Sequence, residues 1–247
     1  MSRPDENPTD ASRPGATIAD VWRSGPPTAS APITVRQTRP EDFAAVRELQ
    51  RAAYPAIEPW SDEQFASQVR IFPEGQMVAE HNGVVIGASA SLVVAWDDYG
   101  VDHTWNGITG GGFFTTHDPA GRTLYGAEVV VNAKRRGHGI GRTLYKARRR
   151  LCERLNLRRI IAAGRLPGYR EVKDVMSPEL YAMRVVWGDI PDPVLRFQMS
   201  QGFHYCGVIH NYLPEDGPSC GNAALIVWLN PRYAPPRPVA KARRRSA

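Results

Sequence analysis

The chain has 247 residues, 42% of them hydrophobic, and a formal net charge of +6 at pH 7. This length suits one domain of about 200 residues with tails. Its apolar stretches are too short or too interrupted to span a bilayer, and its N-terminus lacks the apolar core of a secretory signal. Three widely spaced cysteines without a Cys-x-x-Cys pattern are typical of a reducing compartment. We therefore expect a cytoplasmic protein with no membrane partner.

The basic excess lies at the C-terminal end. Residues 232–247 hold six basic and no acidic side chains, whereas residues 1–32 hold three basic and four acidic ones. A basic terminal run is more often a solvated end than a nucleic-acid arm. Nucleic-acid binding is therefore not expected, and it ranks last among the functions that the sequence leaves open.

Residues 1–32 are rich in Pro, Ser, Thr and Gly and lack hydrophobic periodicity, so burial cannot repay the entropy of ordering them. We predict disordered tails at 1–32 and 232–247 around one domain at 33–231. This domain opens with a predicted strand at 33–36, an amphipathic helix from Pro40, and a second helix capped by Ser61. A hairpin follows, with strands at 76–80 and 84–96 around the turn His81-Asn82-Gly83.

The second part of the domain alternates strands and helices after a glycine-rich loop at 109–123. The periodicity then predicts a strand at 125–132, a helix at 140–155, a strand at 158–163, short helices at 177–187 and 192–201, and strands at 203–213 and 223–229. The strand, turn, helix and strand between 125 and 163 form a βαβ crossover.

The turn inside this crossover reads Lys134-Arg-Arg-Gly-His-Gly-Ile-Gly-Arg142 and contains Arg-x-x-Gly-x-Gly from Arg136 to Gly141. Glycines permit unusual dihedral angles and let a ligand approach the backbone. The helix that follows offers unpaired N–H groups and a positive dipole end, which together bind anions. Residues 134–159 also hold eleven Lys or Arg against one acid, Glu153. This segment therefore predicts a site for a pyrophosphate such as that of CoA.

Other types of glycine-rich loop fit less well. A Walker loop needs Gly-x-x-x-x-Gly-Lys-Ser/Thr, whereas Gly141 follows the wrong glycine interval and precedes Arg142 and Thr143. A dinucleotide fingerprint needs Gly-x-Gly-x-x-Gly and an acid about 20 residues on, and no acid ends the next strand at Ala163. A loop that only turns the chain stays an alternative.

The element order and the motif at Arg136 to Gly141 resemble the GNAT superfamily of N-acetyltransferases over about residues 33–231. The resemblance is closest to GNAT domains that precede a carbon-nitrogen hydrolase (nitrilase-like) domain, through segments 108–119, 124–131, 164–169, 192–198 and 211–216. We expect no hydrolase portion here, because the chain stops shortly after Pro231. The implied fold class is α/β, or α+β in some schemes. Its mixed, mostly antiparallel sheet of about six to seven strands is flanked by helices and includes the βαβ phosphate-loop unit.

The resemblance implies acetyl-CoA as a co-substrate and no metal. Backbone groups of Val129, Val130 and Val131 would pair with the pantetheine arm and polarise the thioester. The phosphates would be held by the loop residues Arg136, Gly137, His138, Gly139, Ile140, Gly141 and Arg142. The residues themselves also predict no metal site, because the histidines lack metal-ligand spacing at positions His103, His117 and His204.

The catalytic groups are less well defined. Glu128 lies where some GNAT members place a general base, and a half-buried carboxylate can have a raised pKa. An equal alternative is a glutamate that only hydrogen-bonds in the sheet or binds the charge of the acceptor. The family often places a tyrosine acid where this chain has Gln198, which gives up no proton, so that role would pass to Tyr205, Tyr212 or solvent. The family's common CoA-contacting asparagine is also missing near Pro191.

The implied function is transfer of an acyl group, typically acetyl, from CoA to a primary amine by direct attack in a ternary complex. The acceptor would be a small molecule or a protein or peptide amine, in a pocket built from loops 54–60, 96–116 and 166–189. A non-catalytic acyl-CoA-binding or regulatory module is the alternative that Gln198 favours. The sequence leaves the acceptor, the acyl length and the oligomeric state open, with a homodimer among the options.

Overall fold

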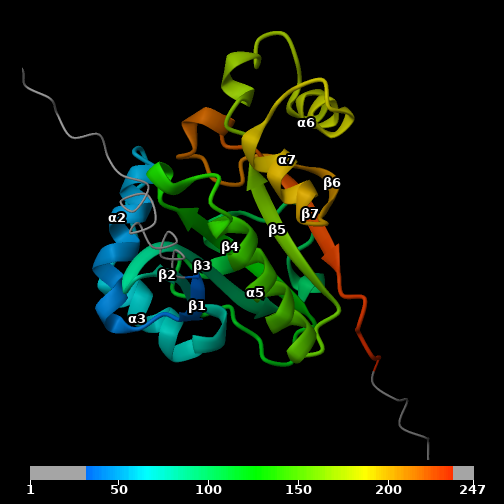
Figure 1. The fold of residues 1–247 in the computed structure, drawn as a ribbon. Coiled ribbons are helices and arrows are strands. Elements are labelled where there is room, and N and C mark those ends of the chain that lie inside the picture. Colours follow the sequence, from blue (N-terminus) through cyan, green and yellow to red (C-terminus); the bar gives the residue numbers. More distant parts are fainter. Residues whose placement is uncertain (1–31, 236–247) are drawn as a thin grey trace, which may run out of the picture. The chain divides into compact units, whose positions relative to one another are not determined.

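A seven-stranded mixed sheet forms the frame of the domain in the computed structural model, which describes residues 32–235. The strands are β1 (Thr34–Gln37), β2 (Met77–His81), β3 (Val84–Val94), β4 (Thr123–Val131), β5 (Arg159–Arg165), β6 (His204–Ile209) and β7 (Ala223–Leu229). Their order across the sheet is β1-β2-β3-β4-β5-β7-β6 (Figure 1). Strands β4 and β5 pair in parallel, and the other neighbouring pairs are antiparallel. The predicted mixed, mostly antiparallel sheet is confirmed.

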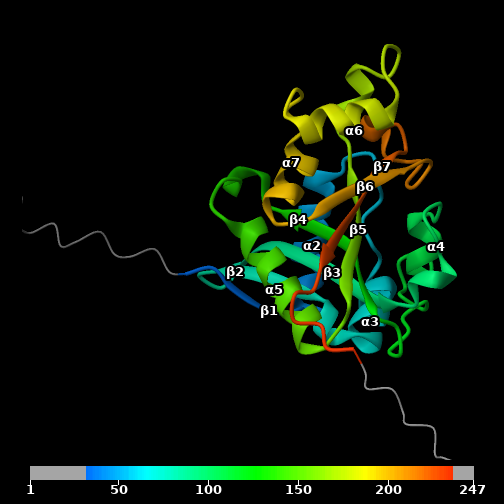
Figure 2. The same ribbon diagram turned by 90° about the vertical axis from the view of Figure 1, so that its right-hand side faces the viewer.

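Helices cover both faces of this sheet. One face carries α2 (Phe43–Ala53), α3 (Asp62–Ile71) and α4 (Trp105–Thr109), and the other carries α5 (Ile140–Arg154), α6 (Pro178–Trp187) and α7 (Pro193–Ser200). Figure 2 shows α3 and α4 on one side of the strands and α5 and α7 on the other. The predicted apolar stripe of α2, with Phe43, Val46 and Leu49, packs into the hydrophobic core between the sheet and α2, α3 and α4. The sheet therefore separates two hydrophobic cores, one under each set of helices.

Local sequence signals place several of these elements as predicted. Ser61 and Gln64 exchange hydrogen bonds in a capping box at the start of α3. Asn82 and Gly83 have φ of 52° and 74° and form the turn between β2 and β3. The βαβ unit of β4, α5 and β5 is also present.

Other element ends differ from the prediction. The strand predicted at 203–213 is too long, because Asn211 adopts a left-handed φ of 50° and turns the chain after β6. The strand predicted at 84–96 ends at Val94, where a short 3-10 helix follows. Helix α4 was not predicted; the Thr104 side chain caps it, and the chain leaves it at Gly110 with a φ of 60°.

The described residues continue past the predicted domain end at 231. Ala234 exchanges hydrogen bonds of 2.8 and 2.9 Å with the side chain of Asn156. The rest of the two predicted tails, residues 1–31 and 236–247, lies outside the described residues.

A one-residue bulge in β4 changes which way its side chains face. Successive residues of β3 lie opposite Glu128 and Gly126, so Ala127 is the extra residue. Residues an odd number of positions apart face opposite sides of a regular strand, yet Tyr125 and Val130 both lie in the core beneath α2. The bulge therefore accounts for Glu128 facing α2 in the middle of the strand.

A buried arginine from α5 fastens this bulge. Arg148, 2% exposed, donates from Nε to Ser91 Oγ at 2.9 Å, and from Nη2 to Ala90 O at 2.9 Å and Glu128 O at 2.6 Å. Gly126 leaves room for the guanidinium, since a Cβ there would lie 2.8 Å from Nη1. Burial lowers the pKa of Arg148, but an arginine keeps its charge in proteins. The bulge is thus held by charge-assisted hydrogen bonds.

Arg148→Met should lower the free energy of unfolding by about 2–4 kcal/mol, because two buried carbonyl oxygens lose their donor while the side-chain volume is largely kept. Urea denaturation of the purified variant measures this loss. Arg150→Met, on the exposed side of the same helix, is the matched control and should change the free energy by less than about 0.5 kcal/mol. Equal effects from the two substitutions would contradict the role of Arg148.

Candidate active site

Strands β4 and β5 pair over only the first part of β4. Their parallel register covers residues 123–126 of β4, whereas β4 pairs with β3 as far as Val131. Residues 127–131 of β4 and 163–165 of β5 therefore have no pairing with each other, and we call this place the β4–β5 gap. Main-chain groups need hydrogen-bond partners when they are buried. The gap is therefore a place where a ligand can pair with the backbone of β4.

Side chains from three directions bind the carbonyl oxygens of residues 127–129 of β4. Trp105 Nε1 donates to Ala127 O at 3.2 Å, and Tyr54 Oη donates to Val129 O at 3.2 Å. Arg148, described above, binds the carbonyl of Glu128 between them. These contacts hold β4 where β5 no longer supports it.

The predicted phosphate loop is exposed and open. Gly137 and Gly139 have φ of 83° and 80°, and a Cβ at either position would meet no atom within 4 Å. Helix α5 begins at Ile140, and no side chain caps it. The N–H groups of its first turn are therefore available to an anion, next to the exposed Arg136 and Arg142.

Three other residues of the loop contribute to the fold. A Cβ at Gly141 would lie 2.9 Å from Phe197 Cζ, so this glycine admits the packing of α7. His138 Nδ1 lies 3.1 Å from the carbonyl oxygens of the two preceding loop arginines. The Ile140 side chain is 2% exposed and packs with Leu144. Gly141 and Ile140 therefore offer a ligand their main chain only.

Glu128 faces α2 and is half-buried. Its carboxylate oxygens accept hydrogen bonds of 3.0 and 2.9 Å from Gln50 Nε2, and Gln50 Oε1 accepts one of 3.2 Å from the Trp60 N–H. Burial raises the pKa of Glu128 to about 7, although the hydrogen bond from Gln50 and the charge of Arg148 act in the opposite direction. A carboxylate with this pKa can accept a proton near neutral pH.

Tyr54 and Arg165 stand beside the gap. The Arg165 guanidinium, at the end of β5, lies 4.9 Å from the centroid of the Tyr54 ring. Arg165 also forms a two-point ion pair with Asp216, which is 2% exposed and accepts a hydrogen bond of 2.5 Å from Ser219 Oγ. These partners fix the position of the guanidinium, so Arg165 places a fixed positive charge beside the gap.

The structure does not bring Tyr205 to the gap. It lies on the outermost strand β6, and β7 separates β6 from β5. Tyr212 belongs to a closed cluster in which its hydroxyl lies 2.7 Å from Tyr125 Oη, which lies 2.8 Å from His103 Nε2. Burial raises the pKa of Tyr212. Its hydroxyl is thus engaged inside the core.

Gln198 of α7 is buried against β5 and α5. Its Nε2 donates to Tyr145 Oη at 3.2 Å, while its Oε1 has no hydrogen-bond partner among the described residues. A Cβ at Gly164 would lie 2.1 Å from this Oε1. Because Gly164 belongs to the part of β5 that does not pair with β4, the unpartnered oxygen borders the β4–β5 gap.

Gln50, Tyr145 and Arg148 are among the residues at the site that were not predicted from the sequence. Gln50 and Arg148 carry a weak signal, because each is a polar residue on the buried stripe of an amphipathic helix. Tyr145 carries none, since an aromatic residue next to Leu144 is ordinary core composition. Their roles can be recognised only from contacts between segments that are distant in the sequence.

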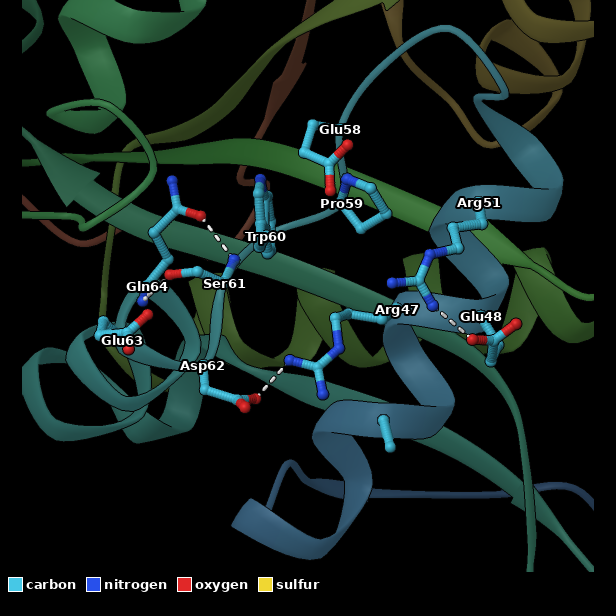
Figure 3. Close-up of a pocket in the computed structure, with 11 residues that line it drawn as sticks. Arg47, Glu48, Arg51, Glu58, Pro59, Trp60, Ser61, Asp62, Glu63 and Gln64 are labelled. Atoms are coloured by element: carbon cyan, nitrogen blue, oxygen red, sulfur yellow. Dashed lines mark hydrogen bonds and ion pairs between the residues drawn. The ribbon is translucent and has the colours of Figure 1, made fainter.

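A shallow polar hollow lies between α2 and residues 58–64 (Figure 3). Arg47 pairs there with Asp62, and Arg51 pairs with a glutamate one turn before it, so these charges largely neutralise one another. Trp60 borders this hollow and also a second cavity, which reaches Glu128. Trp60 therefore lies between the surface hollow and Glu128.

Residues 32–235 contain no group of three or more His, Cys, Asp and Glu side chains that could hold a metal ion. Within the same range, every helix is too short or too polar to cross a bilayer.

The chain is similar to several known proteins. Residues 43–170 match the model of the "Acetyltransferase (GNAT) family". The chain is 40% identical over 203 residues to the "Probable hydrolase YhcX" of Bacillus subtilis (strain 168), a match that covers 82% of this chain and 40% of that protein. It is 34% identical over 205 residues to the "Uncharacterized N-acetyltransferase YkwB" of the same strain, covering 81% of this chain and 90% of that protein.

The solved structure "GphF GNAT-like decarboxylase in complex with isobutyryl-CoA" has a TM-score of 0.66 at 22% identity and covers 80% of this chain and 99% of that chain. At this identity the likeness concerns the fold. The family model spans more than half of the sequence, and the match to YkwB covers nearly all of that relative. The chain belongs to the acetyltransferase (GNAT) family.

Proposed function

We propose that the chain is an acyl-CoA-dependent N-acyltransferase that moves an acetyl group from acetyl-CoA to a primary amine by direct attack in a ternary complex. The arrangement around residues 127–131 of β4 carries this proposal. An unpaired strand edge and an open glycine loop at the start of α5 offer main-chain groups to one substrate. Glu128 faces α2, where Gln50 holds its carboxylate, and would serve the other substrate. Two substrates can therefore meet at β4.

The residues of the gap fit an acyl-CoA. The N–H groups at the start of α5 suit a diphosphate, and the edge of β4 suits the amide groups of the pantetheine arm. The buried and unpartnered Oε1 of Gln198 would accept an N–H or O–H from the same ligand. The GphF structure, which has a similar fold, holds isobutyryl-CoA. We propose the same class of ligand here, with acetyl as the acyl group.

In this proposal Glu128 takes the proton that the attacking amine must lose, directly or through a water. Its pKa of about 7 suits transfer near neutral pH. Main-chain N–H groups of Val129, Val130 and Val131 polarise the thioester carbonyl. The amine nitrogen then bonds to the acyl carbon, and the carbon–sulfur bond breaks with its electron pair going to sulfur.

The acceptor in this proposal is a small-molecule amine or the amine of a peptide or protein. A second candidate function keeps the acyl-CoA site but has no turnover, and the glutamine at position 198 favours it. Release of free CoA across a broad panel of amines separates the two. A protein that binds acetyl-CoA but releases no CoA with any amine would support the second candidate.

We further propose that the chain is related to GNAT domains that precede a carbon-nitrogen hydrolase domain. The match to the probable hydrolase YhcX supports this, because it covers 82% of this chain but 40% of that protein.

The cysteines are free thiols, one buried and two exposed, which supports a cytoplasmic location.

Gly139→Asp should weaken CoA binding at least about 30-fold, because a carboxylate would lie where the diphosphate approaches the first turn of α5. Isothermal calorimetry with CoA measures the affinity. Gly100→Asp is the matched control, since Gly100 also has a positive φ, of 64°, and open space around a Cβ. Unchanged affinity in Gly139→Asp would remove the loop from the CoA site.

Glu128→Gln should lower kcat by about 100-fold and remove the rise of activity with pH that wild type shows up to about pH 7. The rise is expected because the general base must be ionised, and the pKa of Glu128 is about 7. A pH–rate profile of wild type and variant, with any amine that wild type accepts, checks this. A variant that keeps the same rise would show that another group is the base.

The same substitution has a readout that needs no acceptor. Folding raises the pKa of Glu128 from 4.5 to about 7, so the stability that its neutral form contributes is complete below pH 4.5 and is lost as the pH rises through 7. Glu128→Gln should therefore gain up to about 3 kcal/mol on wild type between pH 5 and pH 8. Urea denaturation at both pH values measures this, with exposed Glu215→Gln as the control.

A further inference from the structure

A thiolate leaves more easily when a nearby group gives it a proton, and the hydroxyl groups around the β4–β5 gap differ in whether their proton is available. Tyr54 Oη already donates to Val129 O. The hydroxyls of Tyr125 and Tyr212 bond to each other inside the core. Tyr145 differs, because its oxygen accepts a hydrogen bond from Gln198 Nε2 and its own proton has no acceptor among the described residues.

The position of Tyr145 is fixed by its packing. Its ring meets Phe197 and Phe203 edge to face, with centroids 5.3 and 5.5 Å apart. The Gln198 amide that binds the hydroxyl lies beside Gly164, in the part of β5 that does not pair with β4. A rigid ring with one free proton at the edge of a substrate gap is suited to donate that proton to the substrate.

We propose that Tyr145 donates its hydroxyl proton to the sulfur of the departing CoA, and that Gln198 is the positioning residue that leaves this proton free for the gap. This assignment rests on the proposed acyl transfer. As the nitrogen–carbon bond forms and the carbon–sulfur bond breaks, the electron pair goes to sulfur, which takes the Tyr145 proton. The proton that the amine loses goes to Glu128 and then to solvent, and solvent returns a proton to Tyr145.

The neighbours of Tyr145 suit this step. Burial raises the pKa of Tyr145, so the hydroxyl is protonated at neutral pH and available as a donor, while Arg148 and the hydrogen bond from Gln198 act in the opposite direction. The Arg148 guanidinium lies 5.6 Å from the ring centroid. Both groups would stabilise a transient phenolate. A glutamine in α7 can therefore support proton donation although it gives up no proton itself.

CoA alone is the probe for the first test, because its thiol titrates without an acceptor. A donor at sulfur stabilises the bound thiolate, so the thiol of CoA bound to wild type should have a pKa about one unit below that of CoA bound to Tyr145→Phe. Ultraviolet absorbance of the thiolate across pH measures this at saturating protein. Gln198→Met should shift the titration in the same direction by less. Tyr169→Phe, which removes a hydroxyl elsewhere in the same core, is the control and should match wild type.

Equal thiol pKa values in wild type and Tyr145→Phe, with CoA binding shown by calorimetry for both, would overturn the proposal. A shift caused by Tyr205→Phe or Tyr212→Phe instead would overturn it too. If Tyr145→Phe binds no CoA, the Gln198→Met titration decides. A wild type that binds CoA but acylates no amine would contradict the proposed function alone, since the thiol titration still reports on Tyr145.

Turnover gives the second test if wild type accepts an amine. Tyr145→Phe should lower kcat about 100-fold with acetyl-CoA and leave the KM for acetyl-CoA nearly unchanged. The defect should shrink with the selenium analogue of acetyl-CoA, because a selenolate is a weaker base and leaves without a proton. Equal defects with both donors would show that Tyr145 has only a structural role.

Discussion

The early end of the pairing between β4 and β5 is the constraint on which the rest of this structure depends. Two parallel strands joined by a helix would normally pair along their whole length, and here they separate after residue 126 of β4. The connecting helix α5 contributes to this region at two places. Its first turn provides the N–H groups that we propose bind the anion, and Arg148 two turns later binds the β4 bulge. One helix thus positions the two ends of the proposed acyl-CoA site.

The bulge at Ala127 decides which groups meet across the sheet. Because of it, Glu128 faces α2 and its carboxylate is held by Gln50. Tyr145 and Gln198 approach the same part of the sheet from the α5 and α7 face. The two proton-handling groups of the proposed reaction therefore stand on opposite faces, and the substrates would react between them. In the proposed reaction, this arrangement would place a base near the incoming amine and an acid near the outgoing sulfur without bringing the two together.

Most of the fold could be predicted from the sequence because its signals are local. Helix caps such as Ser61, the Asn82-Gly83 turn and the apolar stripes of α2 and α5 are readable within a few residues. The proposed phosphate loop could be recognised for the same reason, since its glycines and arginines lie close together in the sequence. The short helix α4 and the end of β6 were missed because they depend on single residues in unusual backbone conformations.

The chemistry beyond the loop could not be predicted in the same way, because it depends on contacts between distant residues. Gln50 and Glu128 are 78 positions apart, and Arg148 and Ala90 are 58 apart. The position of Tyr205 could not be predicted because it depends on the strand order. Strand β7 lies between β5 and β6, so Tyr205 on β6 lies away from the gap. Composition and periodicity do not encode that order.

Amide hydrogen exchange on the whole chain, with and without CoA, tests the central claim most directly. The account predicts that CoA slows exchange at residues 127–131 of β4 and at residues 137–142 around the start of α5, because the ligand takes the place of a missing strand and of a helix cap. Protection of other segments while both of these stay unchanged would contradict it.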